Sequence, residues 1–266
     1  MTDKKRPALD GQTALVTGGG RGIGQAICTT LAERGANVAV ADLDPDEIAE
    51  TVATIEDRGG IAVGMEIDVR NPDRVEEAVE ETIERFGSIE ILVNNAGIAG
   101  PTAPCEAVEP DAWDETMAVN LRGAFLVCRA VLPSMKAKGY GRIVNIASVS
   151  GKRPLLNRTP YVASKMGLIG FTRTLALEGG EHDINVNAVC PGSVEGPRLD
   201  HVIEKQAEAK GRGVEVERSE SFEGPTVRGE LVRREDVAAL VAFLCSADAD
   251  RITGQDLNVS SGKVMY

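Results

Sequence analysis

Short apolar runs alternate with longer segments of helical periodicity along the chain. The first run, Thr13–Thr17, precedes a helical pattern from about Gly22 to Arg34, and a second apolar run follows at Asn37–Asp42. Continuous apolar runs of about four to eight residues are typical of strands that are buried on both faces of a sheet. Their alternation with helices predicts right-handed crossovers and a parallel sheet with helices on both faces.

The alternation continues to the end of the chain. Further strands are predicted at Ile61–Ile67, Ile89–Val93, Arg142–Ile146, Asn185–Val189 and Asp256–Val259. Further helices are predicted from Asp44-Pro45 to the break at Gly59-Gly60, and at Pro72–Phe86, Asp111–Lys138, Pro160–Glu178 and Glu235–Ser246. No linker or internal repeat divides this pattern, so we expect one α/β domain over residues 1–266.

Composition and charge narrow the class of protein. The chain has 266 residues, 42% of them hydrophobic, which is enough for a substantial core. Its 41 acidic and 29 basic residues give a net charge of −12, which argues against a nucleic-acid or anionic-membrane partner. The polar start, Met1–Asp10, lacks the apolar core of a signal peptide, and no apolar run approaches the roughly 18 residues of a membrane span. We expect a soluble cytoplasmic protein.

The cysteines and histidines give no sign of a metal site. His182 and His201 lack partners at metal-ligand spacing, and the five cysteines are scattered without a CxxC pair. An odd number of scattered cysteines favours free thiols in a reducing compartment. The cysteines are Cys28, Cys105, Cys128, Cys190 and Cys245.

A glycine-rich turn joins the first strand to the first helix. Its glycines, Gly18, Gly22 and Gly24, follow a G-x3-G-x-G spacing rather than G-x-G-x-x-G. Small residues at such a turn let a pyrophosphate approach the backbone amides and the positive end of the helix dipole. The turn therefore predicts a nucleotide site that also includes Arg21 and Ile23.

Asp42 ends the second strand, 18 residues beyond Gly24. A carboxylate there can accept hydrogen bonds from the adenosine ribose and would repel a 2′-phosphate, which favours NAD over NADP. Arg21 is a contrary signal, because it could bind a 2′-phosphate. A solvated acid at the end of a strand is the structural alternative for Asp42.

Tyr161 and Lys165 lie four residues apart, on one face of a predicted helix. A free tyrosine has a pKa of about 10, and a fixed positive charge nearby lowers it. The pair could therefore exchange protons near neutral pH. A helix whose polar face carries Tyr and Lys by coincidence is the alternative while the pair is considered alone.

Taken together, the motifs resemble those of the short-chain dehydrogenase/reductase family, from about Gly11 to Gly262. The resemblance implies a doubly wound (Rossmann-type) α/β fold with seven parallel strands, and an NAD(H)-dependent oxidoreductase that interconverts a secondary alcohol and a ketone. It rests on Thr17-Gly18-x3-Gly22-x-Gly24, Asp68, Asn94-Asn95-Ala96-Gly97, Asn120, Ser148, Tyr161-x3-Lys165 and Pro191-Gly192.

The resemblance also implies residue roles. Tyr161 would exchange a proton with a substrate oxygen that Ser148 also binds, although Ser150 is a rival for Ser148. Lys165 would grip the nicotinamide ribose and act on Tyr161, and Asn120 would hold a water of a proton relay. The other cofactor contacts would come from Asp68 and Val69 at the adenine ring, from Asn95, Ala96 and Gly97 in the cleft, and from Pro191, Gly192 and Val194 near the nicotinamide.

Two departures and a variable segment leave the substrate open. Gly196 stands where the family often has a threonine, and Ser260-Ser261-Gly262 replaces a common Asp-Gly-Gly. Residues Ser193–Leu231 correspond to the family's substrate lid. Basic residues of this lid, or of the loop before Tyr161, could recruit an anionic substrate, although interleaved glutamates favour a solvated charged face. These residues are Arg198, Lys205, Lys210, Arg212, Arg218 and Arg228 in the lid, and Lys152, Arg153 and Arg158 in the loop.

Other functions and assemblies are kept as alternatives. They are an NADPH-dependent carbonyl or 3-oxoacyl reductase and, more remotely, a nucleotide-binding regulator without turnover. The resemblance implies a homotetramer or homodimer formed through the predicted helices Asp111–Lys138 and Pro160–Glu178. The substrate is expected to be a small molecule, possibilities being a polyol or a hydroxy acid.

Overall fold

The fold is known from a computed structural model that describes residues 8–266, except for the side chains of Arg198 and Ala209. Seven strands form one parallel sheet in the order β3-β2-β1-β4-β5-β6-β7. The predicted doubly wound α/β fold is confirmed. The strands are β1 (Thr13–Thr17), β2 (Asn37–Asp42), β3 (Ile61–Glu66), β4 (Ile91–Asn94), β5 (Gly141–Ile146), β6 (Ile184–Pro191) and β7 (Asp256–Val259).

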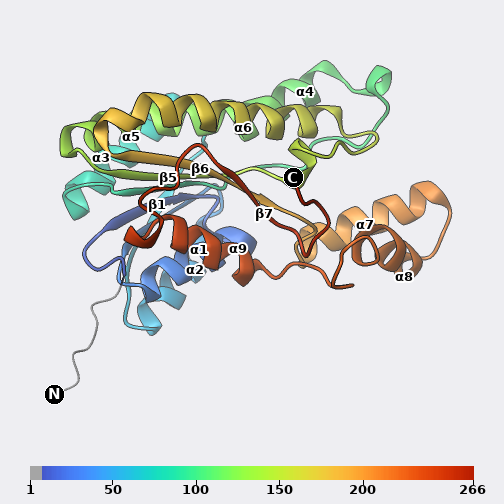
Figure 1. The fold of residues 1–266 in the computed structure, drawn as a ribbon, viewed down its shortest axis with the longest axis horizontal. Coiled ribbons are helices and arrows are strands. Elements are labelled where there is room, and N and C mark those ends of the chain that lie inside the picture. The colour runs from blue at the N-terminus through green and yellow to red at the C-terminus, as the bar shows by residue number, and fades with distance from the viewer. Residues whose placement is uncertain (1–7) are drawn as a thin grey trace.

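Helices cover both faces of the sheet (Figure 1). One layer consists of α1 (Gly22–Glu33), α2 (Pro45–Asp57) and α9 (Arg234–Leu244). The other consists of α3 (Pro72–Phe86), α5 (Gly123–Lys138) and α6 (Thr159–Gly179). Each layer packs its own apolar cluster against the sheet. Burial on both faces explains why the central strands read as continuous apolar runs rather than alternating ones.

Side-chain caps fix where the two outer helices begin. Asp44 accepts hydrogen bonds from the backbone N–H groups of Asp46 and Glu47, as the predicted N-cap of α2 requires. Asn71 caps α3 in the same way. Helix α1 differs, because Arg21 at its N-cap position makes no side-chain cap and its first turn holds no acidic residue.

The predicted helix Asp111–Lys138 is continuous in the structure, but it contains a π-helical turn that the sequence pattern does not predict. Helix α4 (Pro110–Met117) passes into a wide π-helical turn at Ala118–Arg122 before α5 begins. A π-helical turn accommodates one extra residue, and such turns are frequent at functional sites. Hydrophobic periodicity over a long segment does not resolve one inserted residue, so the sequence pattern misses this turn.

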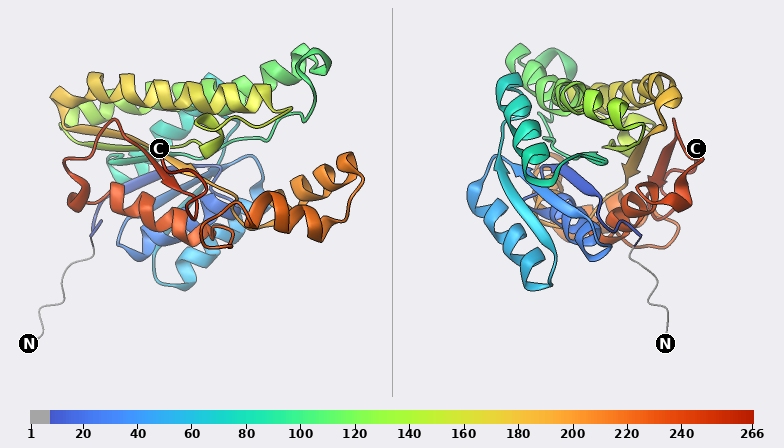
Figure 2. Two further views of the ribbon diagram at one scale, coloured as in Figure 1. Left: turned by 45° about the vertical axis from the view of Figure 1, so that its right-hand side comes forward. Right: turned by 90° about the vertical axis from the view of Figure 1, so that its left-hand side faces the viewer.

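The segment after β6 forms an excursion from the sheet that contains α7 (Pro197–Lys210), α8 (Val214–Glu217) and a second π-helical turn. Its ends meet at a parallel bridge between Val194 and Val232. In Figures 1 and 2, α7 and α8 extend from one end of the molecule. Inside this segment the fully buried Glu217 pairs with Lys210 and Arg212, which holds the corner between the two helices together.

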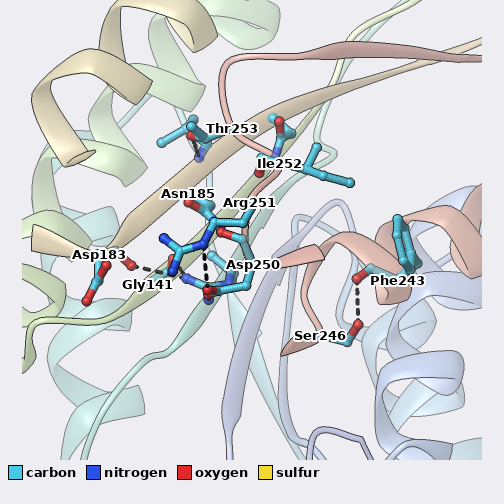
Figure 3. Close-up of polar contacts among 12 residues, drawn as sticks. Gly141, Asp183, Asn185, Phe243, Ser246, Asp250, Arg251, Ile252 and Thr253 are labelled. Carbon is cyan, nitrogen blue, oxygen red and sulfur yellow. Dashed lines mark hydrogen bonds and ion pairs between the residues drawn. The ribbon is translucent and has the colours of Figure 1, made fainter. Parts of the chain in front are cut away.

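The opposite edge of the sheet is closed by the chain between α9 and β7 (Figure 3). Asn185 donates to the backbone oxygen of Asp250 at 2.9 Å, and the hydroxyl of Thr253 accepts from the N–H of Val186 at 3.1 Å. The buried Arg142 pairs with the Asp250 carboxylate at 2.7 Å. These contacts secure the amino ends of β5 and β6 and leave the carboxyl ends for the loops that carry the predicted site.

Among residues 8–266, no helix is long and apolar enough to cross a membrane. The five cysteines are free, and all but Cys105 are buried. Burial raises the pKa of the Cys190 thiol to about 11 and that of Cys245 to about 12. Within the described part of the chain, no cluster of three or more His, Cys, Asp or Glu could hold a metal ion.

Candidate active site

Most of the predicted site residues lie at the carboxyl ends of six neighbouring strands, β3-β2-β1-β4-β5-β6. From β1 the chain adds β2 and β3 on one side of the sheet and then returns to add β4 on the other side of β1. The strand order therefore reverses between β1 and β4. In open parallel sheets, ligands bind outside the carboxyl ends of the strands at such a switch point. The glycine-rich turn follows β1, and the Asn95 and Ser148 segments follow β4 and β5.

The glycine-rich turn is tightly packed around the carbonyl of Gly18. Gly18 has a φ of 63°, and the side-chain amide of Asn95 donates to its oxygen at 2.7 Å. A Cβ at Gly24 would overlap this oxygen and would come within 2.7 Å of Asn95 Nδ2. Because Arg21 makes no side-chain cap, the first backbone amides of α1 remain available to another acceptor, an arrangement that suits a phosphate group.

Asp42 is held at the end of β2, facing the glycine-rich turn. One carboxylate oxygen accepts from the N–H of Gly20 at 2.8 Å and the other from the N–H of Leu43 at 2.7 Å. Arg21 points elsewhere, because it pairs with Glu47 on α2 at 3.0 Å while remaining 80% exposed. The positive charge that could bind a 2′-phosphate therefore already has an acidic partner.

Asp68 and Val69 follow β3. The Arg70 guanidinium donates to the Asp68 carboxylate and holds the pKa of Asp68 below its usual range. Val69 is buried, and its side chain lies against Gly123, where an added Cβ would come within 2.7 Å. Both predicted residues are thus fixed at the carboxyl edge of the sheet.

The Thr17 hydroxyl joins the first strand to the segment after β4. It accepts from the backbone N–H groups of Asn95 and Ala96 at 3.1 and 3.2 Å. Behind it, Asn94 donates to Asn145 at 2.9 Å. The motif included Thr17, but its spacing alone did not indicate that this hydroxyl positions the predicted cofactor segment.

Asn120 is buried in the π-helical turn. Its side-chain oxygen accepts from the backbone N–H of Ile98 at 2.8 Å. Its amide nitrogen donates to the backbone oxygen of Ile98 at 3.0 Å and to the hydroxyl of Ser164 at 3.1 Å. A Cβ added at Gly97 would lie 3.2 Å from Asn120 Oδ1 and 3.5 Å from Lys165 Nζ. The structure therefore brings Gly97, Asn120 and Lys165 together.

Lys165 is buried in α6, and its Nζ donates to the backbone oxygen of Ile146 at 2.7 Å. Ile146 ends β5, so this bond ties α6 to the strand that precedes Ser148. The buried Ser148 hydroxyl bonds with that of Ser150 at 3.1 Å and accepts from the Ser150 N–H at 3.1 Å. The two candidate serines are therefore hydrogen-bonded neighbours just beyond the end of β5.

Two positive charges flank the Tyr161 ring. Lys165 Nζ lies 6.0 Å and the Arg158 guanidinium carbon 5.0 Å from the ring centre. Arg158 is buried and donates to Ala99 O at 2.7 Å and to Thr102 Oγ1 at 3.2 Å. It thus fastens the loop after β4 beside Tyr161, a contact that the sequence pattern did not predict.

The predicted nicotinamide segment continues β6. The Gly192 N–H donates to Val259 O at 2.8 Å, and Gly192 packs so closely on Ser260 that a Cβ would lie 3.0 Å from its Cα. Val194 forms the bridge to Val232. Gly196, the departure from the family pattern, has a φ of 134°, a backbone conformation that glycine adopts more easily than threonine.

Most basic residues considered for an anionic substrate have acidic partners. Lys152 pairs with Asp256 at 2.6 Å and bonds with Asn258, so its charge is already neutralised by an acid of the chain. In the lid the interleaved acids pair with the bases, and the side chain of Arg198 lies outside the described residues. The lid pairs are Lys205–Glu208, Lys210–Glu217, Arg212–Glu217, Arg212–Glu220, Arg218–Asp200 and Arg228–Glu230.

The sequence reasoning missed Lys263. Its Nζ donates to Ser193 Oγ and to Ser221 O, both at 3.2 Å, beneath the lid. Lys263 directly follows Ser260-Ser261-Gly262, the stretch that departs from the family pattern. Its place next to a departure from the family pattern could have drawn attention to Lys263, but a sequence pattern does not show where the lysine side chain points.

Known proteins share this fold and much of this sequence. D-beta-hydroxybutyrate dehydrogenase of Cupriavidus necator is 38% identical over 258 residues, 96% of this chain and 99% of that protein. NAD⁺-bound xylitol dehydrogenase superposes with a TM-score of 0.92 at 31% identity, over 96% of this chain and 99% of that one. An actinorhodin polyketide ketoreductase variant with NADPH gives 0.92 at 36% identity, over 96% and 98%. The model of the short chain dehydrogenase family matches residues 12–207, and this protein belongs to that family.

Proposed function

We propose that this protein is an NAD(H)-dependent oxidoreductase that interconverts a secondary alcohol and a ketone. The observation that carries the proposal is the position of the buried Lys165, which lies beside the Tyr161 ring and bonds to Ile146, two residues before Ser148. The buried Asn120 lies near it, across Gly97. The bound dinucleotide would supply the hydride acceptor or donor. The residues of the chain would position the substrate and the dinucleotide and would transfer the proton.

Tyr161 exchanges the proton with the substrate oxygen, and the Ser148 hydroxyl binds the same oxygen. Lys165 and Arg158 both place positive charge at the Tyr161 ring, which favours the phenolate over the neutral phenol. Asn120 positions the loop after β4 through Ile98, next to Lys165. A nucleotide-binding regulator without turnover has no need of this set of residues.

The dinucleotide would be held by the residues predicted from the sequence. The phosphates would lie on the turn from Gly18 to Gly24, with Ile23 in the first turn of α1, and the adenine beside Asp68 and Val69. The nicotinamide side would meet Ala96 and Gly97 on one strand end and the backbone from Pro191 to Val194 on another. The uncapped amides of α1 support this arrangement.

NAD(H) is proposed over NADP(H) because Asp42 faces the turn while Arg21 is paired with Glu47. Asp42→Asn is expected to shift the ratio of kcat/KM toward NADP(H) by about 10- to 100-fold, since a like charge beside a 2′-phosphate is removed. Steady-state kinetics with both cofactors measure this ratio. The matched control is Asp46→Asn, which neutralises an exposed acid on α2.

A wild-type preference for NADP(H) would overturn the role given to Asp42 and favour the second candidate, an NADPH-dependent carbonyl or 3-oxoacyl reductase. The solved ketoreductase relative with NADPH supports that candidate. The hydroxybutyrate and xylitol dehydrogenases support an alcohol dehydrogenase acting on a hydroxy acid or polyol.

The experiment that tests the main proposal follows nicotinamide absorbance with each cofactor against polyols, hydroxy acids and acyl thioesters. Turnover of at least one class that is lost in Tyr161→Phe supports it. Cofactor binding without turnover of any class would favour the regulator. We also infer a cytoplasmic protein, on the basis of its free cysteines and acidic composition.

A homodimer or homotetramer is proposed through the outer face of α4, α5 and α6. Large apolar side chains are exposed there, including Phe125 at 46% and Met166 at 55%. A groove beside them is lined by Met117, Leu121 and Phe171, among others. Exposed apolar surface of this kind is typical of an interface between subunits.

Phe125→Glu is therefore expected to yield monomers, because each copy would bury a charge and lose a central aromatic contact worth roughly 2 kcal/mol or more. Size-exclusion chromatography with light scattering measures the change. Leu43→Glu, at another exposed apolar side chain, is the control and should leave the assembly intact. An unchanged assembly in Phe125→Glu would show that the subunits do not associate through this face.

A further inference from the structure

Lys263 joins three separate parts of the chain at the edge of the predicted cleft. Its Nζ donates to the hydroxyl of Ser193, which directly follows Gly192, and to the backbone oxygen of Ser221 in the lid. It also lies 5.4 Å from the centre of the Phe222 ring. The ammonium therefore sits between the end of β6, the lid and the C-terminal segment.

The charge around Lys263 is one-sided. Neither Lys263 nor Arg153 has a carboxylate within ion-pair distance among the described residues, although the lid bases named above do. Burial, and secondarily the nearby Arg153, lower the pKa of Lys263. Arg153 is exposed, so water screens its charge, whereas the partly buried Lys263 ammonium bonds only to neutral oxygens and would gain from an anionic partner.

The position of this pair connects it to the proposed reaction. Arg153 follows Ser148 by five residues in the loop after β5, and Ser193 lies just beyond the paired end of the adjacent strand β6. The segments that carry Arg153 and the Lys263 partner Ser193 thus both leave the edge of the sheet that carries Ser148. A substrate bound there by its reacting oxygen could extend a second group under the lid.

We propose that Lys263 and Arg153 form a binding site for an anionic group of the substrate, a carboxylate or a phosphate. The two neutral oxygens named above use two of the three N–H donors of Lys263, and the guanidinium offers further donors in a planar fork. Hydrogen bonds between such cations and an anion are about twice as strong as neutral ones. This inference rests on the proposed function and adds a substrate class to it.

A lid latch is the competing explanation, in which Lys263 only ties Ser221 to Ser193. The two explanations differ in their dependence on ligand charge. A latch affects every ligand under the lid equally, whereas an anion site discriminates between an acid and its uncharged ester.

The test is a calorimetric titration of the full-length protein saturated with NADH. The probes are 3-hydroxybutyrate, its methyl ester and inorganic phosphate, so that the ester removes only the charge and the two anions distinguish carboxylate from phosphate. We expect one anion to bind more tightly than the ester. Lys263→Met and Arg153→Met should each weaken binding of that anion by about 10- to 100-fold and leave the ester unchanged.

Two further variants separate the explanations. Lys263→Arg should retain the preference for the anion, and Lys205→Met, which removes an exposed lid lysine paired with Glu208, should bind as the wild type does. Equal affinity of the wild type for both anions and the ester would overturn the anion site, as would an equal loss of anion and ester in Lys263→Met. Failure of NADH itself to bind is a separate result, which counts against the proposed function; the probes are then titrated into the protein alone.

Discussion

Replacing Tyr161 with phenylalanine is expected to lower kcat by about 10²- to 10⁴-fold, the usual contribution of general acid–base catalysis. The phenol oxygen is the group proposed to exchange the proton, and phenylalanine keeps the ring between Arg158 and Lys165. Binding of NADH should therefore change little. Nicotinamide absorbance measures turnover, and fluorescence titration of NADH measures binding.

Tyr140→Phe is the matched control, because Tyr140 also stacks on an arginine, with the Arg142 guanidinium carbon 4.3 Å from its ring centre. This tyrosine directly precedes β5, at the amino end of the strand, so its loss should not reduce turnover. Equal activity of Tyr161→Phe and the wild type would remove Tyr161 from the reaction. A parallel loss in both variants would indicate a general effect on the fold.

Gly24→Ala is expected to destabilise the protein by about 2 to 3 kcal/mol and to weaken NADH binding by roughly 100-fold. Alanine at a helix interior ordinarily stabilises by about 0.5 to 1 kcal/mol. At this position its Cβ would overlap the Gly18 carbonyl and press on the Asn95 amide, which is bonded to that carbonyl. The turn must open, and the amides at the start of α1 move with it.

Urea unfolding and NADH titration measure the two effects of Gly24→Ala. The control is Gly170→Ala in α6, where an added Cβ has nothing within 4 Å and alanine should stabilise the helix. Wild-type stability and NADH affinity in Gly24→Ala would show that the turn yields without cost. That result would contradict the close packing of Gly18 and Gly24.

The fold was predictable because the signals that determine it are local. Apolar runs gave the strands, and Asp44 marked the start of α2 by its capping chemistry. The π-helical turn around Asn120 was not predictable, because its cause is not local. Three of its side-chain hydrogen bonds reach Ile98 and Ser164, which are far from Asn120 in the sequence.

The candidate site divides in the same way. The motif residues Ser148, Tyr161 and Lys165 were located by spacing, and the sheet brings their segments to one edge. Which charges remain without an acidic partner depends on tertiary contacts, and spacing carries no information on those. Lys152 was one of the bases considered for an anionic substrate and is bound to Asp256, whereas Lys263 was not considered and bonds to Ser193 and to the lid residue Ser221.

The bridge between Val194 and Val232 has a consequence for how this protein can diverge. Because the chain leaves and returns at neighbouring points, residues between them can be replaced or lengthened without changing the register of β6 and β7. Closing a loop of twice the length costs only about 0.6 kcal/mol more. Substrate specificity can thus change through exchange of the segment between Val194 and Val232, while the residues proposed to carry out the reaction stay constant.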